Sequence, residues 1–420
     1  RFIPIPRDRD AAFSKFDGIA IPLIQLVLPD VRFWQSYDAE IPNIKWFNGE
    51  GNNLDRAVLN KFDYTAWIEE AKVIQAGMTH EVIEQAFANL PEEVQDESSQ
   101  AIKNSLKGRL QNIVNIAEVY GKRIDAIVSV HGTNKDDKFT IMRMADGMTQ
   151  VTIARKLKGE TNKVFYDRTF SSKDTKEIWL YGLEDDDVFI VKGDNSDHEI
   201  KMRLIGGYGK DDYDVSNKTN LKVYDWRHEK TTFEDKKPKN QLTNRYETNT
   251  WHWRYFKENN NILLPSFGFR RDDGLFLGAT DTYTNYEFNG NPFRYKHTVT
   301  ANYFLLTNAI ELDYDGVFAN VFPNWNLEVG VYATNDSYAK NFFGNGNETN
   351  YDDDAVDLEF NRARTQQIKG DIGIASKYFK VKGIFETWEI EEDADRLFNT
   401  TNFGETGLLA RQNYAGAEAT

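Results

Sequence analysis

Cysteine is absent from this chain of 420 residues, which excludes disulfide bonds, thiolate nucleophiles, cysteine-ligated zinc and lipid anchors on cysteine. The longest nearly apolar stretch covers residues 19–28 and includes Pro22 and Gln25. It is far shorter than the roughly 20 residues that a membrane-spanning helix needs. Basic residues are the minority, with 51 Lys and Arg against 66 Asp and Glu, and the net charge is −15. This balance excludes nucleic acid as a main partner, because phosphate binding needs a basic surface.

Aromatic residues, by contrast, make up 14% of the chain, although the mean hydropathy is only −0.63. A chain that is polar on average and rich in aromatic residues fits a transmembrane β-barrel, whose strands alternate between apolar and polar side chains. The chain begins at Arg1 with no initiator Met and no signal-like segment, and it stops at Thr420 without a natural final strand. We therefore expect it to be an internal piece of a longer protein.

Hydrophobic spacing divides the chain into five parts. Residues 1–60 hold five of the ten prolines, which predicts a loop-rich segment. Its Arg7-Asp8-Arg9-Asp10 stretch resembles the D-x-D region of kinase-like proteins, which implies that the segment ends an upstream, kinase-like domain. Residues 61–123 show the 3–4 spacing of helices, and capping residues precede the apolar stripes. Residues 124–226 contain short strands of period two, which predict an antiparallel β-sandwich. The charged residues 227–247 predict a linker, and the longer strands of residues 248–420 predict an outer-membrane barrel that continues beyond Thr420.

The strands of the last part alternate strictly. Apolar residues 310, 312, 314 and 318 alternate with Glu311, Asp313 and Asp315, and the segments near 325–331 and 379–385 do the same. Strands of about 9–11 residues with one apolar and aromatic side are typical of transmembrane barrels. A large soluble β-sandwich with one solvated face is the alternative. The overall prediction is a mainly β protein with a helical N-terminal segment, a sandwich and an incomplete barrel.

Several stretches resemble the surface-antigen, BamA-like outer-membrane barrels. These stretches are Phe267-Gly268-Phe269, residues 272–278, Asn291-Pro292-Phe293 with His297, and the block Asn341-Phe342-Phe343-Gly344-Asn345-Gly346-Asn347-Glu348-Thr349. The last block is similar to an "NFFGxGNET" loop of those barrels. The resemblance implies a location in the outer membrane of a Gram-negative bacterium, contact with outer-membrane lipid and lipopolysaccharide, and contact with other outer-membrane proteins.

Upstream stretches appear in similar order in large Gram-negative proteins that join a calcineurin-like metallophosphoesterase to a C-terminal barrel. These stretches are residues 4–13, 53–56, 131–134, 168–170, 177–183, 203–207 and 223–225. Such phosphoesterases hold two metals with D-x-H, G-D-x-x-D and G-N-H-[DE] motifs, because two cations polarise the phosphate and activate water. None of the six histidines lies in such a motif. The resemblance therefore places the catalytic domain and its divalent metals before Arg1, and we assign no catalytic residue and no cofactor to this chain.

Weaker signals suggest metal binding. Asp8 and Asp10, in Arg7-Asp8-Arg9-Asp10, resemble a D-x-D pair that holds Mg²⁺ against phosphate, and the alternative is a structural Arg–Asp network. Asp211 and Asp214 lie in residues 206–214, which resemble one calcium-binding RTX nonapeptide. An RTX site needs stacked repeats, and no tandem array is evident, so ordinary β-turns are the alternative.

Two further features each have two interpretations. The acidic run 351–354 is either a cation site or a solvated loop. The aromatic residues Trp251, Trp253, Tyr255 and Phe256 are either an interfacial girdle that opens the barrel or core packing.

Three functions remain open at this point. The first is an outer-membrane barrel that anchors periplasmic domains as the membrane part of a metallophosphoesterase-family protein. The second is a metal-dependent phosphoester enzyme with Asp8 and Asp10 at the edge of its site. The third is a scaffold or assembly subunit of a larger outer-membrane complex with no catalysis of its own. Because fold does not determine function, the sequence leaves the choice among them, the substrate, the strand number and the oligomeric state undetermined.

Overall fold

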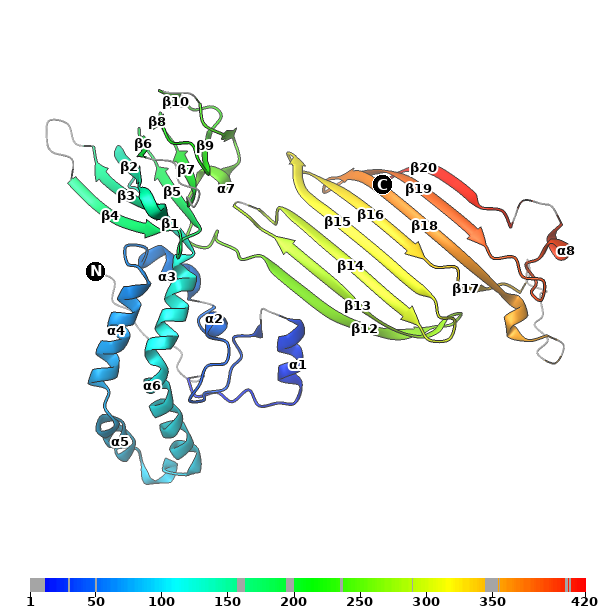
Figure 1. Ribbon diagram of the computed structural model, residues 1–420, viewed down its shortest axis with the longest axis horizontal. Helices are drawn as coiled ribbons and strands as arrows, with labels where there is room; N and C mark the ends of the chain where they lie inside the picture. The colour runs from blue at the N-terminus through cyan, green and yellow to red at the C-terminus, as the bar shows by residue number, and fades with distance from the viewer. Residues whose placement is uncertain are drawn as a thin grey trace. The chain divides into compact units, whose positions relative to one another are not determined.

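The computed structural model describes residues 12–28, 31–49, 51–156, 163–193, 200–234, 237–288, 290–343, 354, 356–404, 407 and 409–420 (Figure 1). The fold is mainly β, with a helical N-terminal segment and a large antiparallel sheet. The chain forms two compact units, one of residues 1–21 and 30–256 and the other of residues 22–29 and 257–420. In the described part of the chain, no helix is long and apolar enough to cross a membrane.

The helices of the first unit include α2 (Ile44–Phe47), α3 (Asn52–Val58), α4 (Tyr64–Gly77), α5 (His80–Ala88) and α6 (Glu97–Asp125), whereas α1 (Ala20–Val27) spans the boundary between the units. Three of the helices in the first unit, α4, α5 and α6, begin at a residue whose side chain caps them. The side chain of Asp63 accepts a hydrogen bond from the Thr65 amide at the start of α4. Asp96 caps α6 in the same way. The helical prediction for residues 61–123 is confirmed.

The end of α6 lies slightly beyond the predicted boundary at residue 123. Arg56 of α3 is buried, and its guanidinium donates to the carbonyl oxygens of Arg123 (3.0 Å), Ile124 (2.7 Å) and Ile127 (2.5 Å). A cation at the end of a helix satisfies its last carbonyl groups and interacts favourably with its dipole. Ile124 and Asp125 therefore complete the last turn of α6 instead of beginning a strand.

Two packed sheets follow α6. The first consists of β1 (Ile127–His131), β5 (Glu177–Leu183), β7 (Lys201–Gly207), β9 (Leu221–Trp226) and β11 (Asn240–Thr243), in that order and all parallel. The second has the order β10-β8-β6-β2-β3-β4 and consists of β2 (Asp137–Arg143), β3 (Met148–Arg155), β4 (Lys163–Ser171), β6 (Val188–Gly193), β8 (Asp212–Val215) and β10 (Thr232–Phe233).

The pairing corrects the prediction of an antiparallel sandwich. From β5 to β11 the chain passes alternately from one sheet to the other, so consecutive strands stack as the coils of a parallel solenoid. Within the described residues of these two sheets, the antiparallel pairs are β2-β3 and β3-β4, and β3 and β4 form a hairpin inserted between the first and second coils. Alternate residues of both sheets point inward and form one core, which includes Phe139, Ile141, Leu180, Phe189 and Leu204.

The segment predicted to be a linker belongs to the solenoid. Within residues 227–247, β10 and β11 add a strand to each sheet. The aromatic residues that follow α7 (Tyr246–Asn249) contact the first sheet: the Trp251 ring lies 4.4 Å from the His131 ring, and Phe256 lies 5.8 Å from Trp179. The first unit extends to Phe256, so these half-buried aromatic residues belong to it.

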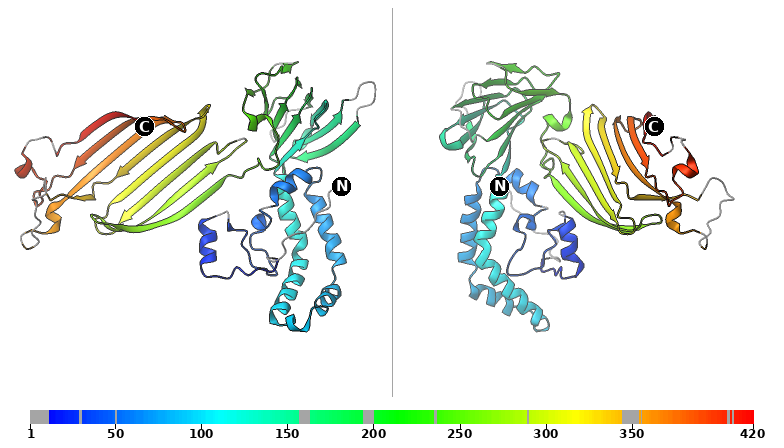
Figure 2. Two further views of the ribbon diagram at one scale, coloured as in Figure 1. Left: turned by 180° about the vertical axis from the view of Figure 1, so that it is seen from behind. Right: turned by 45° about the vertical axis from the view of Figure 1, so that its right-hand side comes forward.

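The second unit is a nine-stranded antiparallel sheet. Its strands are β12 (Asn260–Arg270), β13 (Gly274–Asn285), β14 (Tyr295–Phe304), β15 (Ile310–Phe322), β16 (Trp325–Thr334), β18 (Arg362–Ala375), β19 (Lys380–Ile390) and β20 (Gln412–Ala419), with the short β17 (Tyr338–Asn341) paired to β18. A short helix, α8 (Thr400–Phe403), precedes β20. Neighbouring strands follow one another in sequence, and the sheet is curved (Figure 2). The predicted alternating strands are confirmed as β15, β16 and β19.

Candidate functional site

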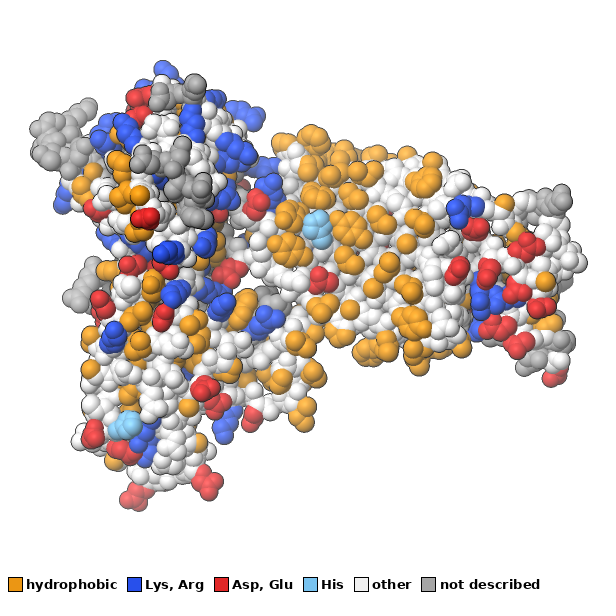
Figure 3. All heavy atoms as spheres, in the orientation of Figure 1, with side chains coloured by type: hydrophobic (Ala, Val, Ile, Leu, Met, Phe, Trp, Pro, Cys, Tyr) orange, Lys and Arg blue, Asp and Glu red, His pale blue; other side chains and the backbone are white. Residues whose placement is uncertain are grey.

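The nine-stranded sheet has two chemically different faces. Because cross-strand neighbours share a face, the register assigns each side chain to one side. The side defined by Phe267, Val299, Leu312, Val331 and Phe385 is called the apolar face. Its exposed side chains include Phe267 (81% exposed), Phe269 (70%), Leu275 (59%), Leu277 (58%), Leu312 (48%), Ile372 (58%) and Phe385 (53%). Figure 3 shows apolar side chains spread over these strands and charged side chains gathered beyond one end. Soluble monomers rarely expose so large an apolar surface.

An acidic residue interrupts the apolar face. Asp281 of β13 pairs with Leu263 on one side and Val299 on the other, so its side chain shares their face.

Aromatic residues gather at the end of the apolar face where β12 begins. The His297 ring lies 5.1 Å from Tyr295, 5.9 Å from Tyr314 and 5.5 Å from Phe318, and its Nδ1 is hydrogen-bonded to the Tyr314 hydroxyl at 2.8 Å. Tyr283 continues the cluster, with its ring 6.3 Å from Tyr295. A band of Tyr and Phe between an apolar surface and a strand end is typical of a membrane–water interface.

The opposite side, called the polar face, carries a hydrogen-bond network. Glu311 of β15 accepts from the Arg270 guanidinium (3.2 Å), the Tyr332 hydroxyl (2.9 Å) and the Asn302 amide (2.9 Å), and Ser266 donates to Asn302 (2.8 Å). Ion pairs and paired hydroxyls continue the face: Lys382–Asp371 (3.8 Å), Thr280–Thr300 (2.9 Å) and Thr282–Thr298 (3.4 Å). Polar groups that meet one another in this way suit a wall around a water-filled interior.

A second unusual site lies in the solenoid and is called the aspartate ladder. Asp137, Asp187 and Asp211 occupy equivalent turns of three successive coils and are 0–1% exposed. The Asp137 amide donates to Asp187 Oδ1 (2.7 Å), and the Asp187 amide donates to Asp211 Oδ1 (3.0 Å). The carboxylates of Asp187 and Asp211 therefore each join their own coil to the preceding one.

The ladder depends on glycine. Gly132, Gly182 and Gly206 each lie five residues before a ladder aspartate. A Cβ at Gly182 would lie 2.1 Å from Asp187 Oδ2, and a Cβ at Gly206 would lie 2.1 Å from Asp211 Oδ2. Because no side chain fits there, only glycine lets the carboxylates enter the turns.

Several ladder oxygens have no hydrogen-bond donor. Asp187 Oδ2 and Asp211 Oδ2 are buried and without a hydrogen-bond partner. Asp137 has more polar partners than Asp187 and Asp211. Its Oδ2 accepts from the Thr133 amide (2.6 Å) and hydroxyl (2.9 Å), and Arg155 Nε lies 3.5 Å from its Oδ1. A buried carboxylate without donors or a cation is costly in its charged form.

Burial accordingly favours the protonated form of the ladder. It raises the pKa of Asp187 to about 9, with a further contribution from the Asp211 charge. Burial also raises the pKa of Asp137 and of Asp211, the latter reinforced by the nearby Asp225. Asp225 is itself buried, which raises its pKa, although Thr231 (2.9 Å), Tyr213 (3.3 Å) and its neighbouring amide donate to it.

The structure does not bring together Asp211 and Asp214, the predicted calcium ligands. Asp211 points into the solenoid, whereas Asp214 lies on the outer side of β8 and its carboxylate is 3.1 Å from Lys192 Nζ. Asp8 and Asp10 lie outside the described residues, as do residues 351–353 and 344–349. Among the described residues, no group of three or more His, Asp or Glu side chains is arranged to hold a metal ion.

The sequence contained a signal for the ladder that a search for tandem repeats misses. The pattern G-x4-D-x-[FY] occurs at residues 132–139, 182–189 and 206–213. Its aromatic residues stack inside the core, with ring centroids 4.5 Å apart for Phe139 and Phe189 and 5.0 Å apart for Phe189 and Tyr213. The β3-β4 hairpin separates the first occurrence from the second and conceals the repeat.

Comparisons of the chain with protein-family models, curated proteins and solved structures found no match.

Proposed function

We propose that the nine-stranded sheet is the membrane-embedded part of this protein and forms one wall of an outer-membrane-type β-barrel that anchors the solenoid unit. The observation that carries this proposal is the contrast between the exposed apolar face and the hydrogen-bonded polar face. Hydrocarbon suits the first face and a water-filled lumen suits the second. The aromatic cluster around His297 then lies at the level of the lipid headgroups.

Closure is part of the proposal. In the described sheet, β12 and β20 are the two edge strands. Unpaired backbone groups are not tolerated in hydrocarbon, so both edges must pair with strands when the sheet is in a membrane. The resemblance to surface-antigen barrels supports an outer-membrane location in a Gram-negative bacterium. The resemblance to barrel-linked metallophosphoesterases supports a role as the anchor of such an enzyme, whose catalytic domain would precede Arg1.

Two neighbouring residues provide a matched test. Val299 lies on the apolar face, 45% exposed, and Thr300 lies next to it on the polar face. The full chain and the variants Val299→Lys and Thr300→Lys are folded in the presence of phosphatidylcholine vesicles. The protease-protected, vesicle-bound fraction is then measured across a urea series.

We expect Val299→Lys to lower the stability of the inserted form by about 2–4 kcal/mol, because a lysine near the bilayer centre faces lipid. Thr300→Lys should have a much smaller effect, since its ammonium would reach water. Equal effects of the two variants would contradict a membrane-embedded sheet and favour a soluble one.

A further inference from the structure

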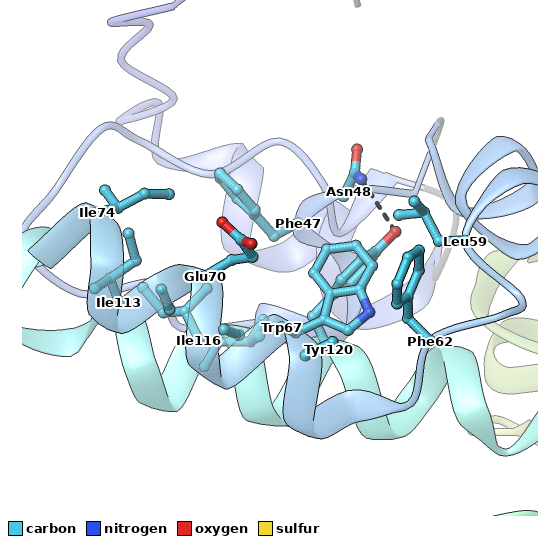
Figure 4. Close-up of a pocket in the computed structure, with 14 residues that line it drawn as sticks. Phe47, Asn48, Leu59, Phe62, Trp67, Glu70, Ile74, Ile113, Ile116 and Tyr120 are labelled. Carbon is cyan, nitrogen blue, oxygen red and sulfur yellow. Dashed lines mark hydrogen bonds between the residues drawn. The ribbon is translucent and has the colours of Figure 1, made fainter. Parts of the chain in front are cut away.

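A cavity of about 540 Å³ lies between α2, α4 and α6 in the first unit (Figure 4). Phe47 of α2, Trp67 and Ile74 of α4, and Ile113 and Ile116 of α6 line it. The volume falls within the roughly 300–1,000 Å³ of pockets that bury small ligands. Small residues keep the cavity open, because Ala66, Ala71 and Ala117 occupy positions where larger side chains would fill it.

Most polar groups at the cavity already bond to one another. Asn48 Nδ2 donates to the Tyr120 hydroxyl (3.0 Å) and to Asp55 Oδ2 (2.9 Å), and the Tyr120 hydroxyl donates to the same Asp55 oxygen (2.6 Å). The Trp67 ring packs edge-on against Tyr120 at 5.2 Å. The polar groups on this side of the cavity are therefore already hydrogen-bonded to one another. The apolar side chains that line the rest of the cavity form no directional bonds with a ligand.

Glu70 is the exception. It is exposed, and Figure 4 shows it among the apolar side chains of the cavity, near Phe47 and Ile116. Within the described residues, no basic side chain lies within ion-pair distance of the Glu70 carboxylate. An ionised carboxylate beside an otherwise apolar cavity favours a positively charged or hydrogen-bond-donating group and repels an anion.

We infer that this cavity binds the hydrocarbon chain of a single-chain amphiphile whose cationic headgroup lies against Glu70. The chain replaces water on Phe47, Trp67, Ile113 and Ile116, which is favourable in proportion to the apolar area covered. The inference concerns the helical part of the chain and does not depend on the membrane role of the nine-stranded sheet.

The probes are dodecylamine, which is cationic at neutral pH, and dodecanoate, which is anionic and has the same chain length. Binding to the full chain is measured by calorimetry below the concentrations at which the probes aggregate. We expect dodecylamine to bind roughly three- to tenfold more tightly than dodecanoate, as a partly exposed ion pair would give. Glu70→Gln should make the two probes bind equally, whereas the control Glu69→Gln, at the neighbouring exposed position, should keep the difference.

A second variant tests the cavity itself. Ala117→Phe fills the space, and it should weaken binding of both probes at least about tenfold while circular dichroism confirms that the helices are intact. Unchanged binding to Ala117→Phe would overturn the inference, because the probes would then occupy another surface such as the apolar face of the sheet. A dimer of the wild-type chain that Ala117→Phe dissociates, without any amine binding, would overturn it in favour of a second copy as the occupant.

Discussion

Replacing Asp187 with asparagine should stabilise the solenoid at neutral pH. Asp187 is 1% exposed, its Oδ2 has no hydrogen-bond partner, and its pKa is raised from the ordinary 3.8 to about 9. The folded protein therefore carries a protonated Asp187 at pH 7, whereas the unfolded chain carries an ionised one. Folding at pH 7 must therefore protonate a carboxyl whose pKa in the unfolded chain is the ordinary one. This costs about 4 kcal/mol, because each pH unit above the ordinary pKa contributes about 1.4 kcal/mol.

Asparagine has the same shape and does not ionise. Its side-chain oxygen retains the position that accepts from the Asp137 amide, and its amide takes the place of Oδ2 close to the Gly206 carbonyl oxygen. The free energy of unfolding at pH 7 should therefore rise by up to about 4 kcal/mol in Asp187→Asn. In the wild type, the stabilisation from neutral Asp187 is fully present below about pH 4 and is lost as the pH rises toward 9. The variant should lack this part of the pH dependence.

Hydrogen exchange of the full chain, read by mass spectrometry over β5 to β8, reports the solenoid separately from the sheet. Wild type, Asp187→Asn and the control Asp212→Asn, whose half-buried side chain lies one residue beyond the ladder, are compared at pH 6 and pH 8. The gain from Asp187→Asn should be larger at pH 8. A variant that is less stable than the wild type at both pH values would refute the reasoning, because Asp187 would then be ionised in the fold and held by a cation.

Two further substitutions and one control test how the first unit is held together. Arg168→Ala should destabilise it by about 3–5 kcal/mol in urea denaturation, because the buried Asp125 carboxylate, 2.8 Å from Arg168 Nη2, loses its ion-pair partner; a loss below 1 kcal/mol would show that water replaces the guanidinium. Gly206→Ala should cost about 1–3 kcal/mol, since its Cβ would collide with Asp211 Oδ2. Gly77→Ala, with no atom within 4 Å of the new Cβ, should be neutral or stabilising by up to about 1 kcal/mol, and similar losses in both glycine variants would argue against the ladder packing.

Local spacing was sufficient to predict the elements of two regions. The apolar stripe of α6 predicts a helix, and the alternation of β15 and β16 predicts half-buried strands, because a side chain's direction follows from the local backbone period. The same alternation assigns Val299 and Thr300 to opposite sides of their strand. The two faces of the large sheet were therefore readable in the sequence, although the network around Glu311 was not, since its members come from four strands.

The arrangement of the strands between residues 124 and 243 was decided by tertiary structure. Period two is the same in a parallel coil and in an antiparallel sandwich, and a short strand does not specify its neighbour. The sequence by itself determined where glycine, aspartate and an aromatic residue recur. Only the stacking of the coils placed Asp137, Asp187 and Asp211 in one buried row and left one oxygen of each without a hydrogen-bond donor. The cavity beside Trp67 depends likewise on how α2, α4 and α6 meet, because packing between distant segments is not encoded in the period of any one of them.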